Sequence, residues 1–171
     1  MLTTIIFIAV ISILVFVHEL GHSFGGLGDE YYTSSVAYTD FYQAGVEPWE
    51  PNLTALADKD HVKWKSHVEP ATPLPTPWNK AGYDSIEAIR NTYDRLAPDY
   101  YEKRKPFYDA SQAIMKNAEH KNKVGAFEGG GYVSKGIYRP AVDCRMFSLS
   151  LVDFDPVCSA AIEQVIDSYV K

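Results

Sequence analysis

The stretch that decides the fold is FVHELGHSFGGLGDEYY, residues 16–32. It places His18 and His22 four residues apart, with Glu19 beside the first histidine. Residues four apart on a helix share one face, so both imidazoles can reach one metal ion. The carboxylate of Glu19 is then placed to polarise a metal-bound water, as in HExxH hydrolases. Zinc suits this work because it binds imidazole nitrogen and lowers the pKa of bound water toward about 7. The motif therefore predicts a catalytic zinc site.

A catalytic zinc needs a third protein ligand and one open position. Gly25 and Gly26 follow His22 and predict a sharp turn, because glycine adopts positive φ angles at little cost. The first strong ligand after this turn is Asp29, and Glu30 is next. We expect Asp29 to be the third ligand. The residues alone leave open that Glu30 takes this place, or that both carboxylates only cap the turn or hold a histidine.

The competing interpretation of HExxH is an ordinary helix with two unimportant histidines. An apolar run directly precedes the motif. If that run is buried, the charge of Glu19 and the two imidazoles are buried with it, and without a metal ion no interaction would compensate the cost. That run, residues 2–17, carries no charge and is rich in Ile and Val, so strand and helix are both open. It is shorter than the roughly 20 residues of a membrane span, although extension through residue 28 makes it long enough. We expect either a buried strand or a membrane anchor.

Length and charge narrow the class of protein. A chain of 171 residues fits one domain, with residues 18–171 carrying the zinc site, loops and helices. A net charge of −6 argues against binding to nucleic acid or to anionic lipid. The two cysteines, Cys144 and Cys158, fit neither a zinc knuckle nor a redox CxxC motif. They would form a disulfide in an oxidising compartment and remain thiols in the cytosol.

The periodicity and the turn residues predict the remaining elements. A short helix is expected within residues 53–69, where His61 and His67 are surface residues, as is His120 further on. Four prolines in residues 70–78 exclude regular structure there. Helices are expected over 85–104, ended or bent by Pro98, over 108–123, and over 155–170, with Asp155 as N-cap and Pro156 as first residue. Residues 124–140 are expected to form turns or a hairpin.

The stretch HELGHSFGGLGDEYY resembles the signature of the bacterial IgA-peptidase family of zinc metallopeptidases, which belongs with the metzincin-like zincins. The resemblance covers about residues 17–171, including GAFEGGGYVSKGIYRPAVDCRMFS and DFDPVC near the C-terminus. It implies an α+β zincin fold. It also implies that Asp29 is the third ligand, one residue beyond Gly28, where metzincins place their third histidine.

The same resemblance assigns roles near the C-terminus. It implies that Met146 lies in the turn beneath the zinc and that Cys144 and Cys158 form a disulfide. Tyr138 is a candidate donor to the oxyanion of the reaction. The competing interpretation of Tyr138 is a packing residue in a chain with twelve tyrosines.

The expected function is a secreted or surface-held zinc metallopeptidase that acts on a protein or peptide, with IgA implied by the family. Glu19 would take a proton from the zinc-bound water and pass it to the leaving amine. The family builds a sheet ahead of HExxH, where this chain has only residues 1–17, so we expect a truncated sheet. The apolar run itself resembles the start of site-2 proteases, which makes a membrane-embedded protease one alternative. A truncated zinc-binding remnant without catalysis is the other.

Overall fold

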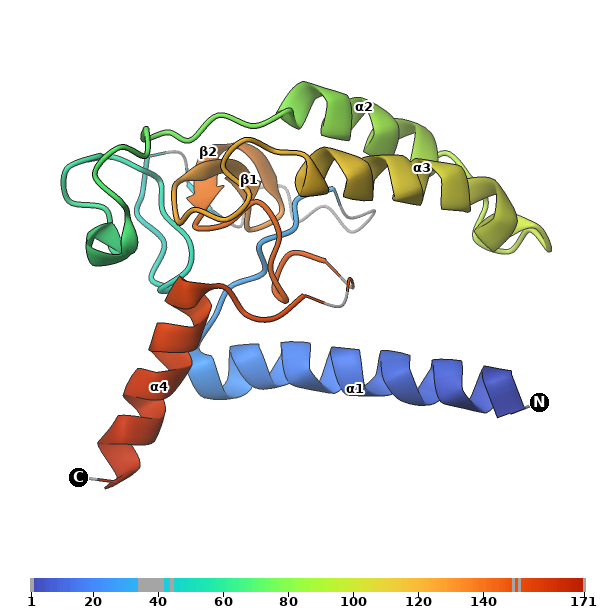
Figure 1. The fold of residues 1–171 in the computed structure, drawn as a ribbon, viewed down its shortest axis with the longest axis horizontal. Helices are drawn as coiled ribbons and strands as arrows, with labels where there is room; N and C mark the ends of the chain where they lie inside the picture. Colours follow the sequence, from blue (N-terminus) through green and yellow to red (C-terminus); the bar gives the residue numbers. More distant parts are fainter. Residues whose placement is uncertain (1, 34–41, 44, 149, 151, 171) are drawn as a thin grey trace.

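The computed structural model describes residues 2–33, 42, 43, 45–148, 150 and 152–170, and on the first helix it describes side chains from residue 12 onward. The described residues form four α-helices and one small hairpin (Figure 1). This mixture confirms the α+β class. The elements are α1 Leu2–Gly25, a 3₁₀ turn Lys65–His67, α2 Lys80–Arg90, α3 Tyr100–Lys116, β1 Phe127–Gly130, β2 Val133–Arg139 and α4 Pro156–Val170.

Helix α1 carries the apolar run and the HExxH motif on one continuous element. Both a strand and a helix were open for residues 2–17, and the structure has a helix there. Gly26 ends the helix with φ +62°, and Leu27 N donates to Gly21 O at 3.1 Å. This left-handed ending turns the chain back toward the histidines. Within the described part of the chain, no helix is both long and apolar enough to cross a membrane.

Residues 124–140, for which turns or a hairpin were expected, contain a hairpin. Strands β1 and β2 pair antiparallel, with Phe127 opposite Arg139. Gly131 and Tyr132 connect them, and both have positive φ, which suits the right-handed twist of a tight hairpin. Gly131 N donates to Asp29 O at 2.8 Å, and Tyr132 N donates to Tyr31 O at 3.0 Å. The tip of the hairpin is thus fixed against the segment that follows α1.

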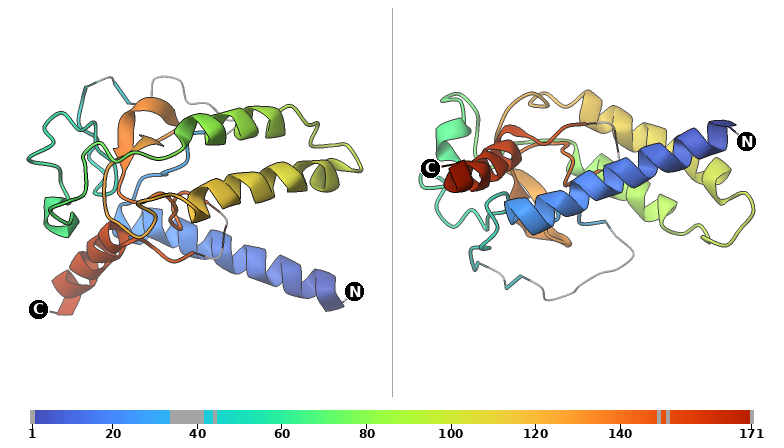
Figure 2. Two further views of the ribbon diagram at one scale, coloured as in Figure 1. Left: turned by 45° about the horizontal axis from the view of Figure 1, so that its top comes forward. Right: turned by 90° about the horizontal axis from the view of Figure 1, so that it is seen from below.

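Helices α2 and α3 lie side by side and extend to one side of the hairpin (Figure 1; Figure 2, left). Helix α2 begins earlier than predicted because the Asn79 side chain accepts from Gly82 N at 3.1 Å and caps it. The predicted helix 85–104 is wrong for residues 91–99, which form turns, and its last residues, 100–104, belong to α3 instead. Pro98 disfavours a helical residue before it, which separates the two helices. The predicted helix 108–123 begins earlier too, at Tyr100, and ends at Lys116. Of the helix expected within 53–69, only the 3₁₀ turn is present.

Helix α4 begins as predicted. The Asp155 carboxylate accepts from Val157 N at 2.7 Å and from Cys158 N at 3.1 Å, which confirms it as the N-cap. Helix α4 packs against the C-terminal end of α1 (Figure 2, right). The buried core joins the loops after α1, the hairpin and the start of α4; it includes Leu27, Tyr32, Tyr83, Met115, Phe127, Val142, Cys144, Met146, Phe147, Cys158 and Ala161.

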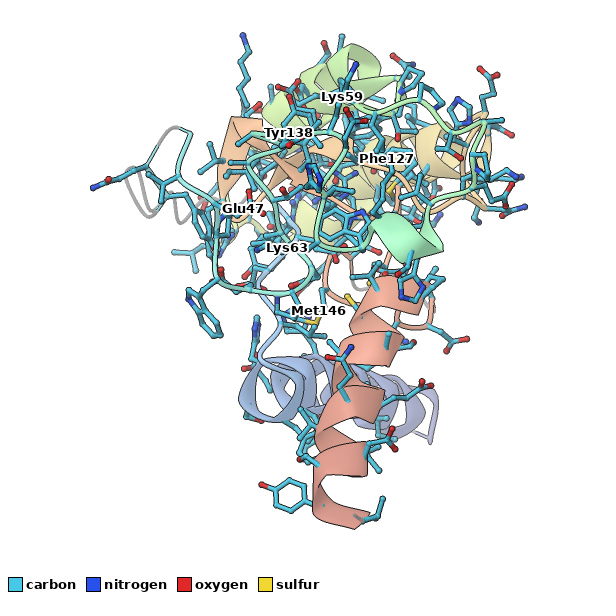
Figure 3. All side chains as sticks on the ribbon, turned by 90° about the vertical axis from the view of Figure 1, so that its left-hand side faces the viewer. Glu47, Lys59, Lys63, Phe127, Tyr138 and Met146 are labelled. Atoms are coloured by element: carbon cyan, nitrogen blue, oxygen red, sulfur yellow. The ribbon has the colours of Figure 1, made fainter. Side chains whose placement is uncertain are left out.

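Lys63 holds the long segment between α1 and α2 in place (Figure 3). Its ammonium donates to the carbonyl oxygens of Pro48, Glu50 and Leu53, the last two at 2.8 Å. It also pairs with Glu47 at 3.3 Å. These contacts fold residues 47–53 into a tight loop. That loop presents the side chain of Asn52 to the segment that follows α1.

Candidate metal centre

Three polar side chains converge at the C-terminal end of α1. His18 and His22 lie one turn apart on the helix, and Asp29 returns to them after the glycine turn. His18 Nε2 lies 2.9 Å from Asp29 Oδ1 and 3.1 Å from His22 Nε2. His22 Nε2 lies 3.2 Å from Asp29 Oδ1. The structure thus brings together the two predicted histidines and the predicted third ligand.

The other nitrogen of each imidazole fixes which atom faces the centre. His18 Nδ1 contacts Arg145 O at 3.1 Å, and His22 Nδ1 contacts Leu27 O at 2.7 Å. A carbonyl oxygen only accepts, so both Nδ1 atoms carry the hydrogen and donate it. In the neutral rings, both Nε2 atoms therefore turn a lone pair toward the carboxylate oxygen. Three acceptors meet, and only a cation can stabilise them together.

The donor set and its spacing fit a divalent metal ion. Imidazole nitrogen and carboxylate oxygen bind zinc at about 2.0–2.2 Å, which in a tetrahedral site separates ligand atoms by about 3.3 Å. The separations of 2.9, 3.1 and 3.2 Å are close to this value. The side chain of Asp29 is 8% exposed and that of His22 is 30% exposed. One side of the group is therefore accessible to solvent and substrate.

The pKa values of Asp29 and His22 reflect the close approach of these groups. Burial opposes ionisation of Asp29, but its contacts with the imidazoles of His18 and His22 and the hydrogen bond from Tyr132 hold the pKa of its carboxyl below the usual range. The hydrogen bond to Asp29 raises the pKa of His22 to about 8. A proton on an imidazole and a metal ion compete for the same lone pairs.

Glu19 lies on α1 beside these ligands but outside the cluster. Its side chain is exposed, and its backbone oxygen accepts from Ser23 Oγ at 2.9 Å. Among the described residues, no hydrogen bond engages its carboxylate. The carboxylate is therefore available to a water or a substrate at the open side.

The turn containing Met146 supports the helix from behind. Met146 is fully buried, and its Sδ would lie 2.8 Å from a Cβ atom built on Gly21. Only glycine allows this approach between the two histidines without displacement. Met146 O accepts from Glu30 N at 3.0 Å, and the neighbouring Arg145 O accepts from His18. The turn of Arg145 and Met146 thereby fixes both the ligand His18 and the segment that carries Asp29.

Two tyrosines near the centre were not predicted. The Tyr132 hydroxyl donates to Asp29 Oδ2, and the Tyr31 and Tyr132 hydroxyls lie 3.3 Å apart. The Tyr31 ring stacks on His18 with centroids 6.3 Å apart. Tyr132 thus orients the carboxylate oxygen that does not face the histidines. The sequence feature that could have indicated Tyr132 is its position directly after three glycines in the hairpin turn.

Comparison with known families agrees with this geometry. A family profile described as IgA Peptidase M64 matches residues 3–166. The chain belongs to the IgA peptidase M64 family. The family is one of metallopeptidases, so the expected substrates are peptides or proteins. No curated protein matches the chain. The match begins at residue 3 and so includes nearly all of the apolar run, whose other resemblance is to site-2 proteases.

The M64 chain does not place Tyr138 at the metal centre. Tyr138 pairs with Glu128 across the hairpin, and its backbone bonds to Thr54. Arg139 is buried in the core, so its neighbour Tyr138 faces the other side of the strand. There it lines a hollow with Trp78 and Lys80. Tyr138 and Met146 are well separated in Figure 3. The structure therefore gives no support from contacts to an oxyanion donor at Tyr138, which stays a prediction.

The two cysteines are close together but not bonded. Cys144 and Cys158 are both free and buried, with sulfur atoms 3.8 Å apart. A disulfide requires about 2.05 Å. The pairing in space was implied by the family resemblance, whereas the disulfide itself is not present. The third-ligand alternative, Glu30, lies with these cysteines: Cys158 Sγ contacts Glu30 Oε1 at 3.3 Å.

Asn52 braces the segment that carries Asp29. It is fully buried, its Oδ1 accepts from Gly28 N at 2.8 Å, and its Nδ2 donates to Gly28 O and Glu30 Oε1 at 2.9 and 3.0 Å. We expect Asn52→Ala to lower the free energy of unfolding by about 3 kcal/mol, because it leaves buried partners unsatisfied. Urea denaturation measures this change. Asn117→Ala, at an exposed helix end, should shift stability by less than about 0.5 kcal/mol. Equal effects of the two changes would contradict the assigned role.

Tyr132→Phe should weaken metal binding by about 10- to 100-fold, the usual cost of losing a hydrogen bond to a metal ligand. The change removes the donor to Asp29 Oδ2 and keeps the ring. Competition with a zinc chelator measures the affinity. Tyr138→Phe is the matched control because it makes the same change away from the centre, and its affinity should equal that of the wild type. A Tyr132→Phe affinity equal to the wild-type value would show that the hydroxyl does not orient Asp29.

Proposed function

We propose that this M64 peptidase holds a zinc ion with His18, His22 and Asp29 and hydrolyses peptide bonds. The observation that carries the proposal is the convergence of three acceptor atoms at 2.9–3.2 Å, with both imidazole hydrogens committed elsewhere. Two imidazoles and one carboxylate leave a fourth position open, as catalytic zinc sites do. The proposed ligand set is thus that of an enzyme rather than of a closed structural site.

Zinc at this place would act as a Lewis acid that lowers the pKa of a coordinated water to about 7 and polarises the scissile carbonyl. The residues of the chain do the rest. Glu19 takes the proton of the attacking water and delivers it to the leaving amine. Its exposed carboxylate and its place beside His18 on α1 support this role. Tyr132 keeps Asp29 oriented, and Met146 keeps the turn of α1 between the histidines in position.

The architecture supports a metzincin-like arrangement. A helix with both histidines, a glycine turn, a third ligand and a methionine turn beneath them follow in that order along the chain. The family name points to an IgA-type protein as the substrate. We infer that the protein acts outside the cytoplasm, where an immunoglobulin would be met. Both statements rest on the family.

A second candidate is zinc binding without turnover. It is favoured by one observation: the only sheet within the described part of the chain is the two-stranded hairpin. A peptidase of this kind needs a strand edge or a groove to hold the substrate backbone beside the metal. The two candidates share the ligands and differ only in catalysis.

Peptide hydrolysis by the purified chain tests the proposal. The zinc-loaded protein should cleave an unfolded protein substrate and purified IgA, tested in parallel. Removal of zinc by a chelator should abolish cleavage, and added zinc should restore it. Cleavage that survives complete zinc removal would contradict a zinc-dependent mechanism. Bound zinc without cleavage of any substrate would favour the non-catalytic candidate.

A further inference from the structure

A second group of ligand-type side chains lies deeper in the fold, under the metal centre. Glu30, Cys144, Asp155 and Cys158 are all buried, and one ligand atom of each lies within 4.8 Å of the others. Cys144 and Cys158 come from the methionine turn and the first turn of α4, and Glu30 follows Asp29 directly. The group therefore joins three separate segments of the chain.

Two carboxylate oxygens in this group have no hydrogen-bond partner. Glu30 Oε1 contacts Cys158 Sγ and Asn52, but the buried Glu30 Oε2 has no partner within the described residues. Asp155 Oδ1 caps α4, but the buried Asp155 Oδ2 is likewise without one. Glu30 is 0% and Asp155 is 6% exposed. Buried carboxylate oxygens normally have partners, so two orphans in one cluster indicate a missing ligand.

The distances fit a metal ion better than a disulfide. Two sulfurs bound to tetrahedral zinc at about 2.3 Å lie about 3.8 Å apart, and sulfur and oxygen lie about 3.5 Å apart. The structure has 3.8 Å between Cys144 Sγ and Cys158 Sγ and 3.3 Å between Cys158 Sγ and Glu30 Oε1. Asp155 N also donates to Cys144 Sγ at 3.4 Å. This contact would stabilise a thiolate.

The geometry points to a second, closed metal site in which Glu30, Cys144, Asp155 and Cys158 bind a thiophilic divalent cation of the zinc class. Two thiolates and two carboxylates provide four ligands and leave no open position, which is the pattern of a structural site. The negative charge is offset by the ion, by the buried Arg139 guanidinium and by the positive end of α4. Arg139 acts on Glu30 electrostatically and is itself fixed by Gly129 O and Val142 O at 2.6 and 3.0 Å.

Such a site would connect the parts that shape the catalytic centre. It would tie the residue after Asp29 to the turn that carries Met146 and to the start of α4. The site needs neither His18 nor His22. The proposal of this second site is therefore independent of the proposed peptidase function.

Cobalt substitution tests the second site in the full chain. The protein is first reduced, stripped of metal and then titrated with Co²⁺, because thiolate ligands give Co²⁺ a charge-transfer absorption that histidine and carboxylate ligands do not give. We expect this absorption in the wild type and in His22→Ala. We expect it to be lost in the double variant Cys144→Ser/Cys158→Ser, and Zn²⁺ should displace it. Metal analysis should find two zinc ions per wild-type chain and one in the double variant.

The absorption spectrum of the cobalt-loaded wild type tests the second site even if the cysteine double variant does not fold. A reduced wild type with two titratable thiols but no thiolate–cobalt absorption would overturn the proposal and leave a pair of buried thiols. A wild type that resists reduction and shows no free thiols would overturn it in favour of a disulfide. An absorption that disappears in His22→Ala but persists in the cysteine double variant would also overturn the assignment.

Discussion

Replacing Glu19 by glutamine is expected to lower kcat/KM for peptide hydrolysis by about 10²- to 10⁴-fold, the usual contribution of a positioned general base. Zinc content should stay at the wild-type value. Glu19 lies outside the cluster of His18, His22 and Asp29, and among the described residues no hydrogen bond holds its carboxylate. Glutamine keeps the shape but cannot accept a proton. The assay follows a fluorogenic peptide that the wild type cleaves, with metal analysis on the same samples.

Glu163→Gln is the matched control for this experiment. Glu163 is an exposed residue of α4, so the same change of charge there should leave kcat/KM within about twofold of the wild type. A Glu19→Gln enzyme that retains more than about a tenth of the wild-type rate would exclude Glu19 as the general base. Loss of zinc in Glu19→Gln would show instead that the carboxylate supports the ligands.

His22→Ala is expected to remove the metal of this centre and to reduce hydrolysis to background. The change deletes one of three protein ligands and leaves His18 and Asp29 to hold the ion with two. The loss of affinity should exceed the roughly 100-fold cost of losing a hydrogen bond to a ligand. Metal analysis after dialysis against a weak chelator measures it. His67→Ala, in the exposed 3₁₀ turn Lys65–His67, is the matched histidine control.

The control should keep both zinc and activity. A His22→Ala protein that keeps its full zinc content and cleaves peptide at the wild-type rate would remove His22 from the ligand set. A His67→Ala protein that loses zinc would show that the ion is bound elsewhere. Circular dichroism on all variants separates metal loss from unfolding.

The local part of the centre was predictable from the sequence. Spacing puts His18 and His22 on one face of a helix, and the glycines after them predict the turn that returns Asp29. Each of these residues lies within one helix turn or one short loop of the next. The nature of α1 was less certain, because Ile- and Val-rich runs suit strands as well as helices. Continuity with the histidines resolves it, since they share a face only on a helix.

The supporting part depends on contacts between residues far apart in the sequence. Tyr132 reaches Asp29 across 103 positions, and Asn52 reaches Gly28 across 24. Neither contact has a local pattern. Tyr138 was a candidate oxyanion donor because of its position in the sequence GIYRP. Side chains alternate along strand β2, so Tyr138 lies on the opposite face of the strand from the buried Arg139. The proximity of Cys144 and Cys158 follows from the family resemblance, while their bonding state depends on atomic distances.

Diffraction from crystals of the zinc-loaded protein at the zinc absorption edge tests the central claim most directly. An anomalous-difference peak should lie among His18 Nε2, His22 Nε2 and Asp29 Oδ1, at about 2.0–2.2 Å from each. Its open side should face the solvent-accessible carboxylate of Glu19. Zinc-loaded crystals without a peak between these three atoms, or with Glu30 in the place of Asp29, would contradict the proposed centre.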